Sequence, residues 1–246
     1  MARAARTLYD EPVADASFWT LAREGRESGL DGGPHQTSAD TQQALLHLVQ
    51  HLFLPVGTSR DGLRSVMFAA PGNCHAANLT AASVAEMLVG YTRRRVCLVD
   101  ANLRNPFLHR RFGLGNNVGL ADVLADTRML GSVAVQVEPT LWVVTAGQRI
   151  SGQLASPAAY ARAVSALHDT FDVVVFAACS RGVDDEALAL AHAVDGVALV
   201  VDQSVRRDVA RHSVSRLQAA QCHVSGVVLC GSPRTSFLAR LLRPRS

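Results

Sequence analysis

Short, almost continuously apolar runs alternate with longer amphipathic segments along most of this 246-residue chain. Runs so dense in Val, Leu and Cys are typical of strands covered on both faces, as in a parallel sheet. The segments between them repeat apolar residues at three- and four-residue steps, which predicts helices. We therefore expect an α/β fold: a doubly wound, mostly parallel sheet flanked by helices and joined by right-handed crossovers. The expected strands are Ser65–Ala70, Val96–Asp100, Leu141–Thr145, Asp172–Ala177, Gly196–Asp202 and Val224–Cys230, with helices at about 77–91, 119–126, 152–169, 185–194 and 206–220.

The two ends of the chain differ in composition from this pattern. Residues 1–38 are rich in Gly, Ser and Asp, and we interpret them as a flexible N-terminal arm. Helical periodicity begins at Ala39 and opens a single domain that extends to residue 234. Residues 235–246 form a short basic tail whose apolar and arginine residues interleave, a composition that allows weak contact with an anionic membrane.

All 24 cationic side chains are arginine, because the sequence contains no lysine. Schiff-base chemistry on the chain's own residues is thereby excluded, and so is the lysine that grips phosphate in a P-loop. A net charge of +3 is too small to indicate a nucleic-acid partner. The five cysteines are dispersed without a C-x-x-C pair, so we expect neither a disulfide framework nor a zinc site. No apolar stretch is long enough for a membrane span, and we expect a cytoplasmic chain.

The segment that follows the second expected strand carries the most specific pattern in the sequence. It begins with Asp100-Ala101-Asn102-Leu103-Arg104-Asn105-Pro106 and continues through His109 and Phe112-Gly113-Leu114 to Gly119-Leu120 and Val123-Leu124. These residues and spacings resemble those of the bacterial tyrosine kinases of capsular and exopolysaccharide systems, which belong to the MinD/ParA-like P-loop ATPases. The resemblance extends over residues 39–231, and it implies a P-loop NTPase fold of the MinD/ParA type.

The loop after the first expected strand departs from that family at its catalytic positions. The family's phosphate loop falls on Pro71–Ala77, which places Cys74 at a glycine, His75 at the lysine, and Ala76 and Ala77 at the metal-binding hydroxyls. The resemblance therefore implies a vestigial phosphate loop. Its expected nucleotide-facing residues are Gly72, Asn73, Cys74, His75, Ala76, Asp100 and Arg104.

Two acidic positions of the family are also replaced, by Asn102 and Ala177. With the lysine, the hydroxyl and both acids gone, we expect negligible phosphoryl transfer, no resident cofactor or metal, and at most residual binding of ATP or ADP. The family phosphorylates tyrosines on its C-terminal tail, whereas residues 235–246 contain none.

Several of these residues also have an ordinary structural explanation. The Pro71–Ala77 loop is either an anion site at a helix N-terminus or a turn kept for folding, and we favour the turn. Asp100 either touches a ligand or caps a neighbouring loop. Arg104 contacts a phosphate, a partner carboxylate or a structural salt-bridge partner, and we favour the salt bridge.

The resemblance implies a catalytically degenerate scaffold or regulator of exopolysaccharide or capsule biosynthesis and export. Its expected partner is the cytoplasmic segment of a membrane polysaccharide chain-length or co-polymerase protein, which would recruit the chain to the inner face of the membrane. The sequence leaves open whether the chain forms a dimer. Two alternatives also remain: a tyrosine autokinase or ATPase with an unconventional site, in which an arginine replaces the lysine, and a MinD/ParA-like positioning factor.

Overall fold

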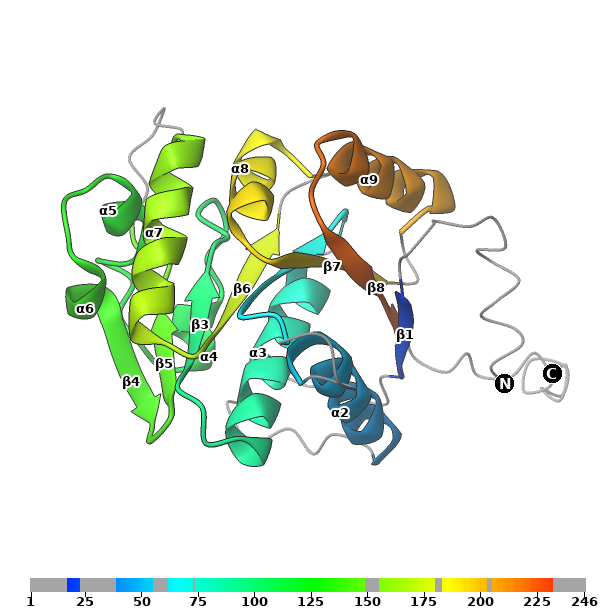
Figure 1. The fold of residues 1–246 in the computed structure, drawn as a ribbon, viewed down its shortest axis with the longest axis horizontal. Helices are drawn as coiled ribbons and strands as arrows, with labels where there is room; N and C mark the ends of the chain where they lie inside the picture. The colour runs from blue at the N-terminus through cyan, green and yellow to red at the C-terminus, as the bar shows by residue number, and fades with distance from the viewer. Residues whose placement is uncertain are drawn as a thin grey trace, which may run out of the picture.

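The structure is a computed structural model that describes residues 17–22, 39–54, 62–72, 74–148, 155–179, 183–202 and 205–231. Within these ranges eight strands form one sheet in the order β1-β8-β7-β2-β6-β3-β5-β4 (Figure 1). Every neighbouring pair is parallel except β4 and β5, which run antiparallel. The strands are β1 (Ser17–Ala22), β2 (Ser65–Ala70), β3 (Val96–Asp100), β4 (Ala134–Glu138), β5 (Leu141–Val144), β6 (Val173–Cys179), β7 (Gly196–Asp202) and β8 (Val224–Gly231).

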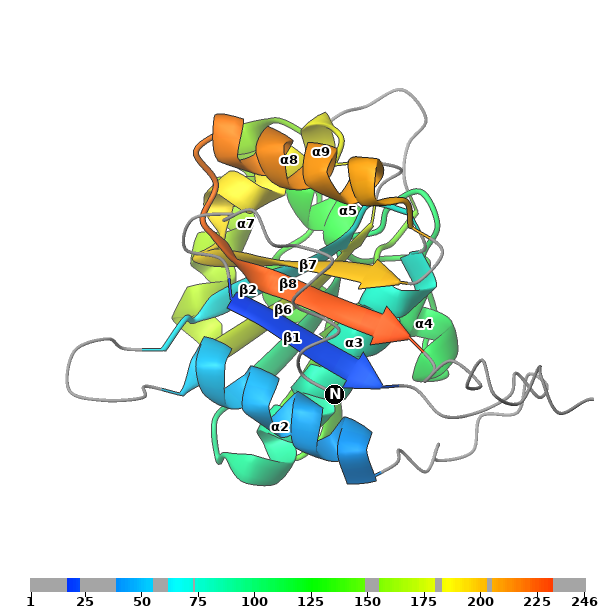
Figure 2. The ribbon, with the colours of Figure 1, turned by 90° about the vertical axis from the view of Figure 1, so that its right-hand side faces the viewer.

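Helices cover both faces of this sheet, as Figure 2 shows from the β1 edge. One face carries α2 (Ala39–Phe53), α3 (Cys74–Tyr91) and α4 (Leu108–Arg111). The other face carries α5 (Leu120–Leu124), α6 (Leu130–Val133), α7 (Pro157–Thr170), α8 (Asp185–Ala193) and α9 (Arg207–Ala219). The expected three-layer architecture is confirmed.

Strand β2 shows why the central strands read as continuous apolar runs. All six of its residues are buried. Val66, Phe68 and Ala70 belong to the core under α2 and α3, while Met67 and Ala69 belong to the core under α7 to α9. Side chains alternate between the two faces of a strand, and here both faces are covered, so the positions after Ser65 are all apolar, while the buried Ser65 hydroxyl donates a hydrogen bond to Asp195 Oδ2 at 2.9 Å.

Both edge strands were missed in the sequence. β1 lies inside the segment interpreted as a flexible arm, and it pairs in parallel with β8 from Ser17↔Gly226 to Ala22↔Gly231. The interpretation of residues 17–22 as arm is therefore wrong, and the sheet begins before residue 39. The rest of the arm, residues 1–16 and 23–38, and the tail, residues 235–246, lie outside the described residues.

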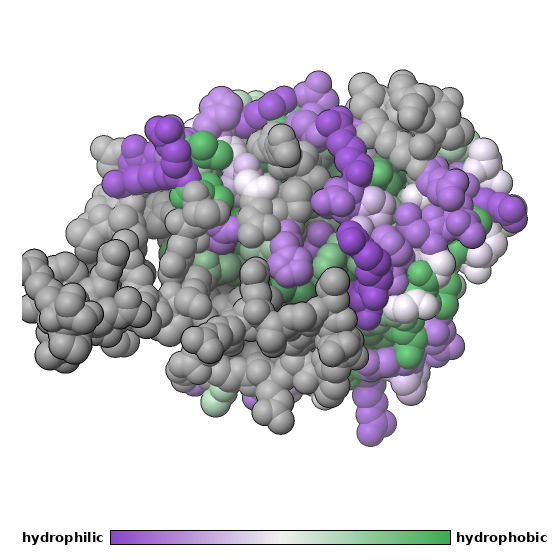
Figure 3. Space-filling model, turned by 180° about the vertical axis from the view of Figure 1, so that it is seen from behind, coloured by the Kyte–Doolittle hydropathy of each residue, from purple (hydrophilic) through white to green (hydrophobic). Residues whose placement is uncertain are grey.

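β4 forms the opposite edge, where no further strand pairs with its outer side among the described residues, and three of its five residues are exposed. Val135 of this strand is 43% exposed, and Met129, just before α6, is 85% exposed. In Figure 3 hydrophobic side chains appear on the side of the molecule where β4 lies, between hydrophilic ones. Among the described residues no helix combines the length and the apolar character that a bilayer span requires.

Specific caps fix the starts of two helices: that of α7 differs from expectation, and that of α8 agrees with it. α7 begins at Pro157 rather than near residue 152, because the Ser156 hydroxyl accepts a hydrogen bond from the Ala159 backbone N–H at 3.2 Å and proline suits the first helical position. α8 begins after Asp184, whose Oδ1 accepts from the Ala187 N–H at 3.0 Å. This cap places the carboxylates of Asp184 and Glu186 at the carboxyl end of the sheet.

Candidate functional site

The loop after β2 leads directly into α3, as the sequence predicts for a strand–loop–helix phosphate site. Gly72 is exposed, Asn73 lies outside the described residues, and Cys74 is the first residue of α3. His75 is exposed in the first turn of the helix, whereas Ala76 and Ala77 are buried in the core between α3 and the sheet. A hydroxyl group introduced at either alanine position would therefore be buried in this core.

Neighbouring segments contact this loop from two sides. The His75 ring meets the ring of Phe107 edge-to-face, with the ring centroids 5.3 Å apart. Val205, which follows β7, lies over Gly72 so closely that a Cβ added to Gly72 would come within 3.1 Å of its Cγ2 atom. His75, which the sequence resemblance aligns with the phosphate-loop lysine, thus makes an aromatic contact between the first turn of α3 and the segment before α4.

Asp100 ends β3 with a fully buried carboxylate. Its Oδ2 atom accepts hydrogen bonds from the backbone N–H groups of Phe107 and Leu108, both at 2.8 Å, and Oδ1 accepts from the N–H of Asn102 at 3.1 Å. Burial raises the pKa of Asp100 above its usual range, although these three hydrogen bonds and nearby His109 lower it. The structure therefore shows Asp100 capping a neighbouring loop.

Asn102 and Ala177 are the two residues that the sequence resemblance aligns with acidic positions of the tyrosine kinases. The Asn102 side chain is 3% exposed, and its Oδ1 accepts from the backbone N–H of Asn105 at 3.1 Å, while Nδ2 has no hydrogen-bond partner among the described residues. Ala177 is fully buried on β6, and its carbonyl oxygen accepts from the Ala101 N–H at 2.9 Å. Both positions thus fasten the end of β3.

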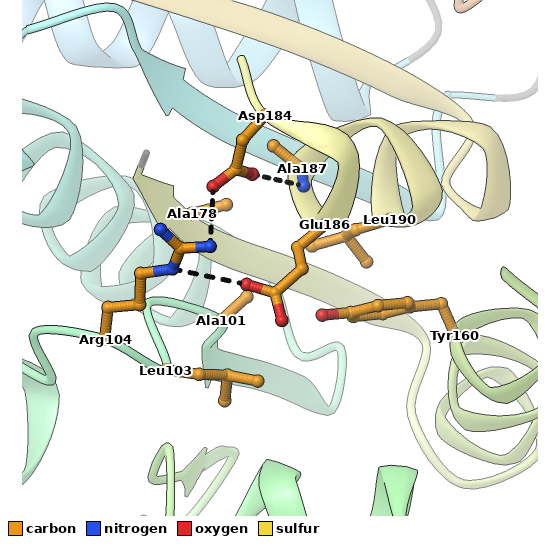
Figure 4. A pocket seen from close by; sticks show the side chains of 9 residues that line it. All are labelled: Ala101, Leu103, Arg104, Tyr160, Ala178, Asp184, Glu186, Ala187 and Leu190. Atoms are coloured by element: carbon orange, nitrogen blue, oxygen red, sulfur yellow. Dashed lines mark hydrogen bonds and ion pairs between the residues drawn. The ribbon is translucent and has the colours of Figure 1, made fainter. Parts of the chain in front are cut away.

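Arg104 lies on the other side of the β3 loop, away from Asp100, and faces α8. Its guanidinium lies 3.6 Å from Asp184 Oδ2 and 3.5 Å from Glu186 Oε2 (Figure 4). The Arg104 side chain is 61% exposed, and that of Glu186 only 13%. The arginine is thus held in a structural salt bridge, the alternative favoured from the sequence.

A small pocket opens beside this ion pair. Apolar side chains line it, including Leu103 and Leu190, together with Tyr160 and the Arg104–Glu186 pair (Figure 4). Its volume is about 20 Å³, which is room for about one water molecule.

The candidate residues therefore divide into two groups. His75 and Asp100 lie on the α3 and α4 side and are linked through Phe107, whereas Arg104 belongs to the α8 side. The sequence analysis missed four contact residues: Phe107, Val205, Asp184 and Glu186. Their partners lie at least 30 positions away in the sequence, in one case more than 130, and no local pattern marks such contacts.

A magnesium–nucleotide complex, which this fold implies in catalytic relatives, does not fit the described residues. Such a site needs a cation on the β and γ phosphates, a hydroxyl on the metal and free carboxylates around it. Here the corresponding positions hold His75 against Phe107, two buried alanines, and an Asp100 carboxylate that already accepts three backbone N–H groups. No phosphoryl-transfer step follows from these residues.

Comparison with known proteins supports the architecture. Neither a protein-family model nor a curated protein sequence matches the chain. Solved structures do match. The chimerical protein CapA2B2 superposes with a TM-score of 0.72 at 17% identity, over 94% of this chain and 98% of that one. The kinase domain of the Escherichia coli tyrosine kinase ETK gives 0.70 at 18% identity, over 93% and 92%.

A third structure shares the same core. The septum site-determining protein MinD of Pyrococcus horikoshii, complexed with Mg-ADP, superposes with a TM-score of 0.56 at 18% identity, over 67% of this chain and 70% of that one. The fold is that of the MinD/ParA-type P-loop NTPases. At these identities the likeness to the kinase domains is one of fold.

Proposed function

We propose that this protein is a catalytically degenerate P-loop NTPase fold that acts as a scaffold or regulator in exopolysaccharide or capsule biosynthesis and export. The observation that carries the proposal is the Asp100 carboxylate, fully buried and bonded to three backbone N–H groups. Three of the about four lone-pair sites of this carboxylate are thus taken by backbone N–H groups, so Asp100 stabilises the loop instead of standing free for a metal-bound ligand.

The first turn of α3 supports the same proposal. Histidine is shorter than lysine and mostly neutral near pH 7, so it cannot replace the lysine as a fixed charge on the phosphates. His75 instead contacts Phe107. A fold that keeps its eight-stranded sheet and its two cores while the catalytic positions become packing positions is useful as a surface for partners.

The proposed partner is the cytoplasmic segment of a membrane protein that sets polysaccharide chain length. Two observations support it: the sequence block from Asp100 to Leu124 resembles the polysaccharide tyrosine kinases, and the fold superposes on tyrosine kinase domains over most of both chains. Docking on such a segment would bring the protein to the inner face of the membrane.

Deletion and complementation in the source organism test this function. Deletion of the gene should change the amount or the length distribution of surface polysaccharide, and the wild-type gene should restore it. A Tyr9→Phe, Tyr91→Phe double variant should restore it equally, because a scaffold needs no phosphorylated tyrosine; the third tyrosine, Tyr160, is buried. Unchanged polysaccharide after deletion would contradict the proposed function. Phosphotyrosine on the purified protein would favour the autokinase alternative.

A further inference from the structure

The three segments around the degenerate loop hold one another directly. Asp100 accepts the N–H of Phe107 at 2.8 Å and so fixes the backbone that carries the Phe107 ring. That ring meets His75 on the first turn of α3, at 5.3 Å between centroids and 86° between ring planes. β3 is thereby connected to the N-terminus of α3 through a chain of three residues.

Phe107 is well placed to transmit this connection. Its side chain is half-buried and packs against the core under α3 and α4, beside fully buried Leu108. On the opposite side of the loop, Val205 is half-buried and lies over Gly72. The loop between β2 and α3 is therefore contacted both by the segment that follows β3 and by the segment that follows β7.

We infer that His75, Phe107 and Asp100 form a clasp at the carboxyl end of the sheet. The clasp holds the segment after β3 against the first turn of α3 in one conformation, so that no bound nucleotide is needed to order them. This inference goes beyond the proposed function: it predicts that the surface around these loops is the same with and without nucleotide. Partner binding by the scaffold would then be constitutive.

A double-mutant cycle tests the clasp. His75→Ala and Phe107→Ala each lower the urea midpoint of unfolding, and the double variant loses less than the sum of the two single losses, because the second change removes a contact that is already gone. Phe107→Leu replaces Phe107→Ala where the latter does not fold. The matched control pairs His75→Ala with Phe171→Leu: Phe171 packs on Trp142 just before β6, at the other end of the sheet, so these losses should add.

Hydrogen exchange on the full chain gives a second measurement. The amides of residues 74–80 and 101–112 should exchange at the same rates with and without ATP and Mg²⁺, and His75→Ala should speed exchange in residues 105–108 as well as in α3. Additive losses in the His75–Phe107 cycle, or loop protection that appears only with ATP, would overturn the clasp. The polysaccharide phenotype of the deletion strain is measured independently of these two experiments. Failure of the clasp and failure of the scaffold function are therefore distinguishable.

Discussion

The Oδ2 atom of Asp100 lies 2.8 Å from the backbone nitrogen of Leu108, and this hydrogen bond joins the last residue of β3 to the first residue of α4. The same oxygen accepts the N–H of Phe107. The end of β3 is thus used here to begin a short helix, and the consequences are measurable.

Asp100→Ala should lower the free energy of unfolding by at least about 2 kcal/mol, because it leaves buried N–H groups of residues 102, 107 and 108 without an acceptor. Asp185→Ala is the matched control: its carboxylate is 88% exposed on α8 and pairs with Arg216, so its loss should amount to less than about 1 kcal/mol. Urea denaturation measures both. Equal losses in the two variants would contradict the role assigned to Asp100.

Gly147 closes the loop after β5 in a backbone conformation that a side chain disfavours. Its φ is +76°, and a Cβ would come within 2.7 Å of the Gly119 nitrogen and 2.8 Å of Asp122 Oδ2. Gly147→Ala should therefore cost more than about 2 kcal/mol. Gly131→Ala in α6, where a Cβ meets nothing within 4 Å, should be neutral or slightly stabilising. Thermal unfolding that ranks the two variants the other way would contradict this geometry.

His168 should make the fold sensitive to mild acid. Burial lowers the pKa of His168 below its ordinary 6.5, an effect that outweighs the opposing influence of Asp195, and its Nε2 has no partner among the described residues. The folded state therefore favours the neutral ring. The stability that this ring contributes is present above pH 6.5 and is lost as the pH falls through the lowered value.

His168→Gln should accordingly reduce the loss of unfolding free energy between pH 7.5 and pH 5. His212→Gln, on the exposed surface of α9, serves as the control and should leave the pH dependence unchanged. Urea denaturation at both pH values measures the two slopes. A His168→Gln protein with the wild-type slope would refute the assignment of a neutral, half-buried His168 ring to the folded state.

Asp184 has two roles that substitutions can separate. It caps α8 through the Ala187 N–H, and it pairs with the exposed Arg104 guanidinium. Arg104→Ala should cost less than about 1 kcal/mol, since the pair is solvated. Asp184→Ala should cost about 1 kcal/mol more through loss of the cap, and Asp184→Asn should recover that difference because asparagine also caps. If Asp184→Asn is as unstable as Asp184→Ala, the charge rather than the cap supports α8.

The sequence predicts the central fold because burial on both faces restricts a strand to apolar residues. The strands β2, β3 and β7 are buried in this way, and each begins and ends at the residues expected from the sequence. The edge strands β1 and β4 escape such a pattern: each pairs on one side only among the described residues, so their sequences are under weaker constraint.

The candidate site was predictable in its location and only partly in its contacts. Strand–loop–helix order places residues 71–76 and 100–104 at the same end of the sheet, as expected. Whether Asp100 caps a loop and what Arg104 binds were open alternatives, since a sequence does not show which distant groups meet. The contact between His75 and Phe107 joins residues 32 positions apart and has no local signal.

A thermal-shift titration of the intact protein with ATP and ADP, each with and without Mg²⁺ and confirmed by calorimetry, tests the central claim most directly. A ligand that binds the folded state stabilises it by about 2.7 kcal/mol at a hundredfold excess over its Kd. Because His75 contacts Phe107 and Asp100 is engaged by three backbone N–H groups, we expect no Mg²⁺-dependent rise in Tm at millimolar nucleotide. A clear rise that requires Mg²⁺ would contradict it and would show that the loop after β2 still forms a working nucleotide site.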